Sequence, residues 1–188
     1  MIQGDLVMEK LNFTSFPTIE TERLILRQLD IKDVNDIFDL RTDQEVSKFL
    51  ERRTINTIEQ AEQFINIMNN GIKESKWIFW AIELKNESKL VGTICLWGFS
   101  EENPKAEIGY ELMPYYQGKG LMQEAIESVI KYGFTALNLK SLSAYAHKDN
   151  LKSIALLERN DFVDETHEDK NNALGNDRIF GLVAKAYL

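Results

Sequence analysis

The turn between Met113 and Met122 carries the residues of this chain that are best suited to bind a ligand. Gly118 and Gly120 flank Lys119, between a strand-like run and a helix-like run. A glycine backbone lets a ligand come close, because no side chain stands in the way. The helix that follows begins with free N–H groups and the positive end of its dipole, and both attract anions. The turn therefore predicts a binding site for an anion such as a pyrophosphate.

Two common nucleotide-binding loops do not match this turn. A Walker A loop requires Ser or Thr after its lysine, and Gly120 stands there instead. The dinucleotide fingerprint requires a third glycine at the position where this chain has Gln123. Because glycine turns also occur for purely structural reasons, the turn alone leaves the ligand open.

The chain has 188 residues and a formal net charge of −8, which fits one acidic globular domain. Direct binding of nucleic acid is not expected, because it would require an excess of basic residues. The negative net charge is compatible with a basic partner such as a polyamine or a cationic peptide. No run approaches the ~18 apolar residues of a membrane helix, and the first residues do not resemble a signal peptide. We expect a cytoplasmic protein with no membrane contact, an extension over residues 1–20 and a single domain over residues 21–188.

Hydrophobic patterning predicts a mixed α/β (α+β) fold. We expect strands over residues 23–27, 77–84, 90–99, 106–113, 141–146, 162–166 and 178–186. We expect helices from residue 30 or 32 to 40, after the capping sequence 57–60, and over 122–136 and 151–159. The strands between residues 77 and 113 should form an antiparallel meander, and the strand–helix–strand step through Gly118 allows parallel neighbours. The result is a mostly antiparallel mixed central sheet flanked by helices.

Several sequence motifs resemble those of one family. Ala-Glu-Ile-Gly-Tyr-Glu-Leu at residues 106–112, the glycine turn, Asn-Leu-Lys-Ser at 150–153 and Leu-Leu-Glu-Arg-Asn-Asp-Phe at 156–162 resemble the GNAT superfamily of acyl-CoA-dependent N-acetyltransferases. Thr-Glu-Arg-Leu-Ile-Leu-Arg at 21–27 resembles its RimJ/RimL-like branch, named for ribosomal-protein N-terminal acetyltransferases. The resemblance runs from about Thr21 to Ala184 and implies the GNAT acyl-CoA N-acyltransferase fold.

The resemblance implies that acetyl-CoA is the cosubstrate and gives roles to individual residues. In this family the strand before the turn splays from its neighbour after Ser141 through a bulge, so the edges of Leu112 and Met113 would pair with the pantetheine arm. Asn150 would cap the next helix and reach that arm, and Ser153 would lie near the cofactor thiol. The residues that would line the pyrophosphate with backbone N–H groups are Gln117, Gly118, Lys119, Gly120, Leu121 and Met122.

The chain departs from the family pattern at two places. Tyr115 stands where the superfamily often has Gln or Arg, so the phosphate role rests on the backbone. Asp161 stands where the branch usually has Gly before Phe162. Asp tolerates the left-handed conformation better than most residues, so the helix can still end there.

Acetyl transfer to an amine needs a base, a donor that polarises the thioester and an acid for the departing thiolate. Glu107 is the first candidate base, because it lies on the strand that the resemblance places next to the thioester, on one face with Gly109 and Glu111. Glu111 is the reserve candidate, and a surface carboxylate is the alternative reading of Glu107. The N–H of Met113 is the candidate oxyanion donor.

Ser153 is the candidate acid for the thiolate, with Tyr110 and Tyr145 as competitors because a phenol is the stronger acid. Attack should be direct, without an acyl-enzyme, because Cys95 lies in an apolar run with no His nearby. A single cysteine also excludes an intrachain disulfide and a cysteine metal cluster, and we expect no metal. His147 and His167 lack a partner at catalytic or metal-ligand spacing.

The acceptor is expected to be a primary amine, either a protein N-terminus or a small molecule. The family places the acceptor rim at residues 42–57, which include Phe49, Glu51, Arg52 and Arg53, and one of the tryptophans could wall the acceptor pocket. A non-catalytic acyl-CoA-binding module that regulates or scaffolds a partner is the alternative, and a phosphate-binding kinase-like domain is a weaker one. A monomer and a homodimer both remain open.

Overall fold

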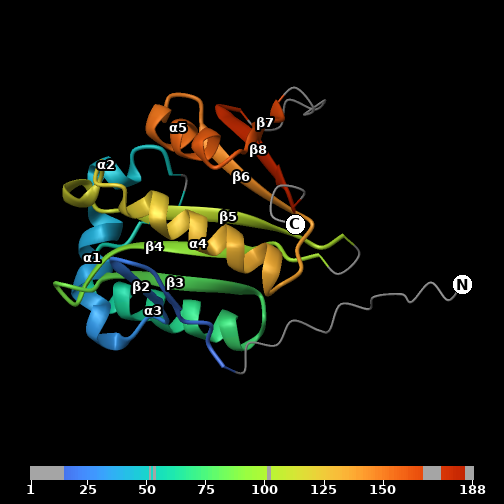
Figure 1. The fold of residues 1–188 in the computed structure, drawn as a ribbon. Coiled ribbons are helices and arrows are strands. Elements are labelled where there is room, and N and C mark those ends of the chain that lie inside the picture. Colours follow the sequence, from blue (N-terminus) through green and yellow to red (C-terminus); the bar gives the residue numbers. More distant parts are fainter. Residues whose placement is uncertain (1–14, 51, 53, 101–102, 167–174, 185–188) are drawn as a thin grey trace, which may run out of the picture.

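One mixed sheet of eight strands forms the centre of the fold (Figure 1). The computed structural model describes residues 15–50, 52, 54–100, 103–166 and 175–184. The strand order is β1-β2-β3-β4-β5-β6-β8-β7, and every neighbouring pair is antiparallel except β5 and β6. The strands are β1 Ile19–Glu20, β2 Leu24–Arg27, β3 Trp77–Leu84, β4 Lys89–Trp97, β5 Lys105–Leu112, β6 Ser141–His147, β7 Val163–Asp164 and β8 Asp177–Val183.

Helices cover both faces of this sheet, with α4 on one face and α1 and α3 on the other (Figure 1). The α-helices are α1 Val34–Thr42, α2 Gln44–Ser47, α3 Ile58–Lys73, α4 Leu121–Thr135 and α5 Leu151–Arg159. Two short 3-10 helices, η1 Ile31–Asp33 and η2 Pro114–Tyr116, precede α1 and the glycine turn. The arrangement confirms the expected mixed sheet with helices on both faces.

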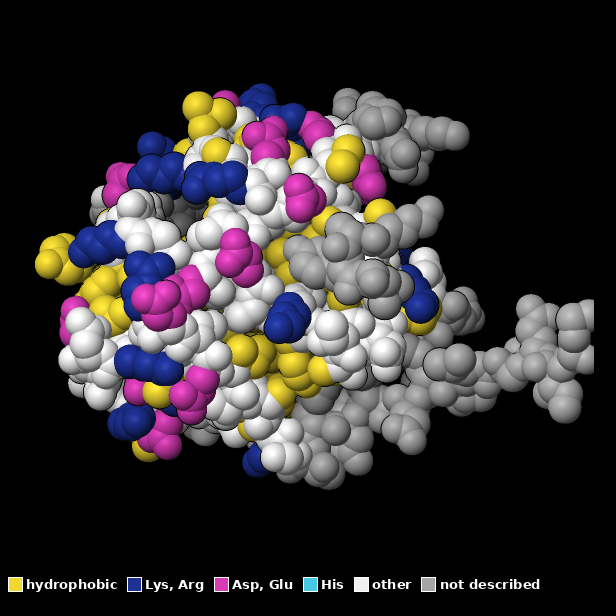
Figure 2. Space-filling view, viewed as in Figure 1, with side chains coloured by type: hydrophobic (Ala, Val, Ile, Leu, Met, Phe, Trp, Pro, Cys, Tyr) yellow, Lys and Arg dark blue, Asp and Glu magenta, His cyan; other side chains and the backbone are white. Residues whose placement is uncertain are grey.

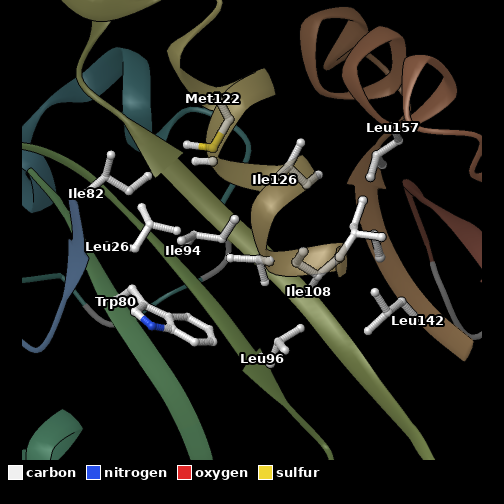
Figure 3. Close-up of a cluster of buried hydrophobic side chains, with 14 of the residues drawn as sticks. Leu26, Trp80, Ile82, Ile94, Leu96, Ile108, Met122, Ile126, Leu142 and Leu157 are labelled. Atoms are coloured by element: carbon white, nitrogen blue, oxygen red, sulfur yellow. The ribbon is translucent and has the colours of Figure 1, made fainter. Parts of the chain in front are cut away.

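The core forms where the sheet meets α4, and side chains from both sides meet there (Figure 3). Alternate residues of β3 serve opposite faces: Trp80 and Ile82 pack toward α4, and Phe79 packs toward α1 and α3. Because β3 is central, both of its faces are buried, so its sequence is apolar almost throughout. The apolar stripe of α4, including Ile126, completes this core.

Local signals placed most elements to within one or two residues. Thr57 caps α3 as predicted, and its hydroxyl accepts the N–H of Gln60 at 3.3 Å. Asp161 has φ 62°, so α5 ends in the left-handed conformation expected there. The two-residue strand β1 and the four-residue helix α2 were not predicted, because segments this short carry no periodic pattern. The predicted closing strand over 178–186 extends past the described residues.

Residues within the predicted extension, residues 1–20, pack on the domain. Phe16 meets the Trp80 ring edge-on, with centroids 6.2 Å apart, and the Trp80 indole N–H donates to the carbonyl of Pro17 at 2.7 Å. Residues 1–14 lie outside the described part of the chain, so the boundary at residue 20 stays a prediction. His167, Glu51 and Arg53 also lie outside it.

Candidate functional site

A V-shaped opening separates β5 from β6 (Figure 1). The two strands pair from Lys105–Ser141 to Glu107–Ser143, and their pairing then stops. By contrast, β5 stays in regular register with β4 from Trp97–Glu107 to Gly92–Leu112. The predicted splay is therefore present, but the predicted bulge in β5 is wrong, because β5 keeps a continuous register with β4.

The opening leaves one edge of β5 without a strand partner beyond Glu107 among the described residues. The N–H of Met113 donates to the carbonyl of Val91 in β4 at 2.9 Å. Because main-chain direction alternates along an antiparallel strand, the polar groups of Leu112 and Tyr110 face the open edge instead. The carbonyl of Leu112 accepts the side-chain amide of Gln117 at 3.0 Å. The carbonyl of Met113 in turn accepts the N–H of Tyr116 at 2.9 Å. Because both main-chain groups of Met113 are already bonded, the expectations that it supplies an oxyanion donor and that it pairs with the pantetheine arm are wrong.

The glycine turn closes the end of this opening and starts α4. Gly118 and Gly120 have φ of 72° and 75°, a left-handed conformation that favours glycine. A Cβ on Gly118 would meet nothing within 4 Å, so the backbone there faces open space. Arg23 fixes the turn, because it donates to the carbonyl of Lys119 at 2.8 Å and to the Glu124 carboxylate at 2.6 Å. The first N–H groups of α4 thus follow a turn whose backbone is fixed and faces open space. Together they can bind an anionic group.

Lysine side chains border the hollow between α5 and the start of α4. Figure 2 shows this hollow with Lys and Arg side chains around it. The ammonium of Lys152 on α5 lies 3.0 Å from the side-chain oxygen of Gln117 and so spans from the helix to the turn. The ammonium of Lys119 lies 3.9 Å from the ring centroid of Tyr115. Lys152 belongs to the Asn-Leu-Lys-Ser motif but was not among the predicted site residues. Its position two residues after the cap residue Asn150 was the available signal.

Two of the predicted acid candidates meet across the opening. Asn150 caps α5 as expected, with its side chain accepting the N–H of Ser153 at 3.2 Å. The Ser153 Oγ lies 2.9 Å from the hydroxyl of Tyr110, which reaches it from β5. Burial raises the pKa of Tyr110 to about 12. Tyr145 lies on the exposed face of β6, opposite the buried Ala144, and so on the other side of the sheet from this pair.

The other face of β5 carries Glu107, Gly109 and Glu111, as the alternation predicted. Glu107 pairs in register with Trp97, and partial burial raises the pKa of its carboxyl. Trp97 lies over Gly109, where an added Cβ would come within 2.7 Å of its ring. Trp97 is thus the tryptophan beside the candidate base, whereas Trp80 is fully buried in the core.

Glu111, the reserve base, is bound by two guanidinium groups. Arg52 approaches one of its carboxylate oxygens at 2.7 Å and Arg41 the other at 3.3 Å. Burial raises the pKa of Glu111 against the lowering effect of both arginines. This carboxylate is engaged in an ion-pair cluster, which leaves Glu107 as the less encumbered base.

The predicted acceptor rim contacts the end of β6. The ring of Phe49 stacks on His147, with centroids 5.2 Å apart and planes 28° from parallel. His147 Nδ1 accepts the backbone N–H of Asp149 at 3.2 Å. The carbonyl of His147 accepts the N–H of Asn150 at 2.8 Å, so His147 joins the rim to the cap of α5.

Cys95 is not placed as a nucleophile. Its thiol donates to the carbonyl of Gly109 at 3.5 Å, and burial raises its pKa to about 12. A thiol with that pKa stays protonated at neutral pH, which favours direct transfer. Within the described ranges, no group of three or more His, Cys, Asp or Glu side chains is placed to hold a metal ion. No helix of the described residues has the length and apolar character to cross a membrane.

Comparison with known proteins assigns this arrangement to a family. The model of the acetyltransferase (GNAT) domain matches residues 23–163, which is most of the chain. The chain belongs to the GNAT acetyltransferase family. This GNAT protein is an acyl-CoA-dependent acetyltransferase, and its cosubstrate is acetyl-CoA.

The GNAT relatives span nearly the whole domain. The N-acetyltransferase YoaA of Bacillus subtilis is 36% identical over 150 residues, covering 80% of this chain and 85% of the relative. The spermidine N(1)-acetyltransferase of Vibrio cholerae is 25% identical, covering 77% and 82%. A solved structure of the ribosomal L7/L12 alpha-N-protein acetyltransferase RimL with coenzyme A superposes with a TM-score of 0.76 at 18% identity, covering 89% and 98%. This last likeness concerns the fold.

Proposed function

We propose that this protein transfers the acetyl group of acetyl-CoA to a primary amine by direct attack at the opening between β5 and β6. One observation carries the proposal: the hydrogen-bonded Tyr110–Ser153 pair lies on one side of β5, and the carboxylate of Glu107 lies on the other. A proton donor and a proton acceptor thus flank the edge at which the two strands separate. This is the division of labour that amide formation from a thioester requires.

The glycine turn and the open edge of β5 are the proposed binding site of the cosubstrate. The N–H groups at Gly118, Gly120 and the start of α4 would hold the pyrophosphate, since they present donors and a positive dipole to open space. The main-chain N–H of Leu112 would donate to a pantetheine carbonyl, as an unpaired strand edge does with an extended chain. The full set proposed to contact the cosubstrate is Leu112, Gln117, Gly118, Lys119, Gly120, Leu121, Met122, Asn150, Lys152 and Ser153.

Acetyl-CoA supplies the thioester carbon to which the amine nitrogen forms its new bond as the C–S bond breaks. Glu107 accepts the proton that the amine loses, directly or through water. Ser153 delivers a proton to the departing sulfur, and the hydroxyl of Tyr110 stands behind it as the proton source. Glu107 then releases its proton to solvent and the Tyr110–Ser153 pair takes one up, so the amide and the free thiol form with no net gain or loss of protons.

The acceptor is a primary amine of a protein N-terminus or of a small molecule. By their names, one relative acts on spermidine and one structural neighbour on a ribosomal protein N-terminus. Both acceptor classes offer a primary amine, so the reaction class is common to them.

Release of coenzyme A thiol, measured with a panel of amines, tests the proposal. Thiol release that depends on one amine class, with the acetylated amine found by mass, is the expected outcome. Tight binding of coenzyme A without amine-dependent release across peptides, amino acids and polyamines would instead favour the alternative, a non-catalytic acyl-CoA-binding module.

A further inference from the structure

A buried cluster of three charged side chains lies on the face of β5 that carries Glu107. Arg41 comes from the last turn of α1, Arg52 from the rim after α2, and Glu111 from β5. Two guanidinium groups share one carboxylate, at 3.3 Å from Arg41 and 2.7 Å from Arg52. The side chains are only 11%, 14% and 14% exposed, so one positive charge is left over in a poorly hydrated place.

The two arginines differ in how well they are satisfied. Besides Glu111, Arg52 donates to the hydroxyl of Ser47 at 3.0 Å and to the carbonyls of Leu40 and Arg41 at 3.5 and 3.4 Å. Arg52 thus holds the rim to α1 and β5. By contrast, Arg41 makes one long bond to Glu111, and its buried Nε has no hydrogen-bond partner among the described residues.

The surroundings of Arg41 are apolar, so its incompletely hydrogen-bonded guanidinium destabilises the fold. Its guanidinium lies 4.3 Å from the ring centroid of Phe64, and burial lowers its pKa. A buried donor without a partner is costly, and a bound ion or ligand is one way in which such a group is satisfied. An anion is the ligand that would satisfy Arg41.

The separation of Glu107 from Glu111, the β5 residue of the cluster, is one that a short peptide acceptor can span. Glu107 and Glu111 are four residues apart on one face of β5, or ~13 Å along the strand. Between them the ring of Trp97 covers Gly109, so the surface from one carboxylate to the other is an indole ring. An extended peptide covers that distance with three to four residues at ~3.4 Å each.

We propose that Arg41 binds a carboxylate of the acceptor, and that the acceptor is a peptide N-terminus with an acidic residue among its first four. This inference rests on the proposed function for the place of the amine at Glu107. It disfavours a polyamine, because a polycation would meet the leftover positive charge of the cluster. The proposal also explains why a second arginine is present: Arg52 alone would neutralise Glu111, so Arg41 is available to bind a further carboxylate.

Equilibrium binding to the protein saturated with coenzyme A tests this without requiring turnover. The probes are tetrapeptide amides Ala-Ala-Asp-Ala and Ala-Ala-Asn-Ala, companions with the acidic residue at the second or fourth position, and spermidine. We expect the best Asp peptide to bind about tenfold more tightly than its Asn counterpart, as a charge-assisted hydrogen bond supplies. Equal binding of each Asp and Asn pair, or tighter binding of spermidine, would overturn the proposal.

Variants of Arg41 separate a ligand site from a structural cation. Arg41→Met should abolish the Asp preference while the urea midpoint stays unchanged or rises, because Glu111 keeps Arg52 as its partner. A lower midpoint would mark Arg41 as structural and overturn the proposal. If Arg41→Met does not fold, Arg41→Lys decides: a reduced but present Asp preference supports the site, and an unchanged preference contradicts it. Arg159→Met, at an exposed arginine of α5, is the matched control.

The same peptides in the thiol-release assay distinguish the two proposals. An Arg41-dependent Asp preference in binding without acetylated product would contradict the proposed function and leave the anion site standing. Acetylation of Asp and Asn peptides with the same KM would contradict the anion site and leave the proposed function standing.

Discussion

The hydroxyl of Tyr110 lies 2.9 Å from the Oγ of Ser153, and this contact joins β5 to α5 across the opening between β5 and β6. The two residues are 43 positions apart in the chain. Considered from the sequence, they were competing candidates for one proton transfer. Side by side, they form a single unit in which one hydroxyl can resupply the other.

Substitutions in this pair should therefore not be additive. We expect Ser153→Ala and Tyr110→Phe each to lower the turnover rate by ~10²-fold, the usual scale of general acid catalysis. The double variant should lose little more than either single one, because both act in one proton transfer. Thiol release at saturating acetyl-CoA measures this, with Tyr145→Phe as the control. Two independent, multiplying losses would show that the residues act separately.

Gly118→Glu should abolish binding of coenzyme A. The substitution places a carboxylate next to the proposed pyrophosphate seat and forces a side chain into φ 72°. Calorimetric titration of coenzyme A measures the effect. Gly175→Glu is the matched control, because Gly175 also has positive φ, at 58°, and open space around a Cβ. Normal affinity in the Gly118 variant would remove the turn from the cosubstrate site.

Glu107→Gln should lower turnover much more than affinity for coenzyme A. In the unsubstituted protein, kcat/KM should rise with pH as Glu107 ionises, at a pH above the ordinary glutamate pKa because burial raises it. The variant should lack this acidic limb. A pH–rate profile that is the same in both proteins would exclude Glu107 as the base.

The stability of the same variant gives an independent test of the raised pKa. Since the folded-state pKa of Glu107 is raised, the protonated form favours folding at low pH, and that contribution is lost as pH rises through the folded pKa. The neutral Glu107→Gln side chain avoids this loss, so urea unfolding at pH 7 should show no destabilisation. A marked fall in the urea midpoint would show that the ionised carboxylate is a stabilising group.

Lys152→Met should weaken coenzyme A binding and flatten its dependence on salt. The Lys152 ammonium lies 3.0 Å from the side-chain oxygen of Gln117, and a phosphate at the glycine turn would replace this neutral oxygen as its partner. Exposed ion pairs are screened, so we expect a loss of ~5-fold at low salt that shrinks as salt rises. Titrations at two ionic strengths measure this, with Lys131→Met on the exposed face of α4 as the control. Equal salt dependence in Lys152→Met and the unsubstituted protein would contradict the contact.

Much of the fold was determined by the sequence within short windows. Thr57 placed the start of α3, Asp161 allowed the end of α5, and the alternation of Glu107, Gly109 and Glu111 set one face of β5. These features depend on side-chain periodicity, capping and φ preferences, which act over a few residues. The glycine turn belongs with them, since its conformation is fixed by residue type.

Tertiary structure alone decided which groups meet. The register of β5 on β4 turns the N–H of Met113 toward Val91 and leaves the polar groups of Leu112 at the open edge. Packing of α5 brings Ser153 to Tyr110, and packing of α1 and the rim brings two arginines to Glu111. These contacts join residues far apart in the chain, and a shift of one residue in strand register would reverse every direction along β5. Local patterns therefore fixed the parts of the site, and long-range packing determined which of them can act together.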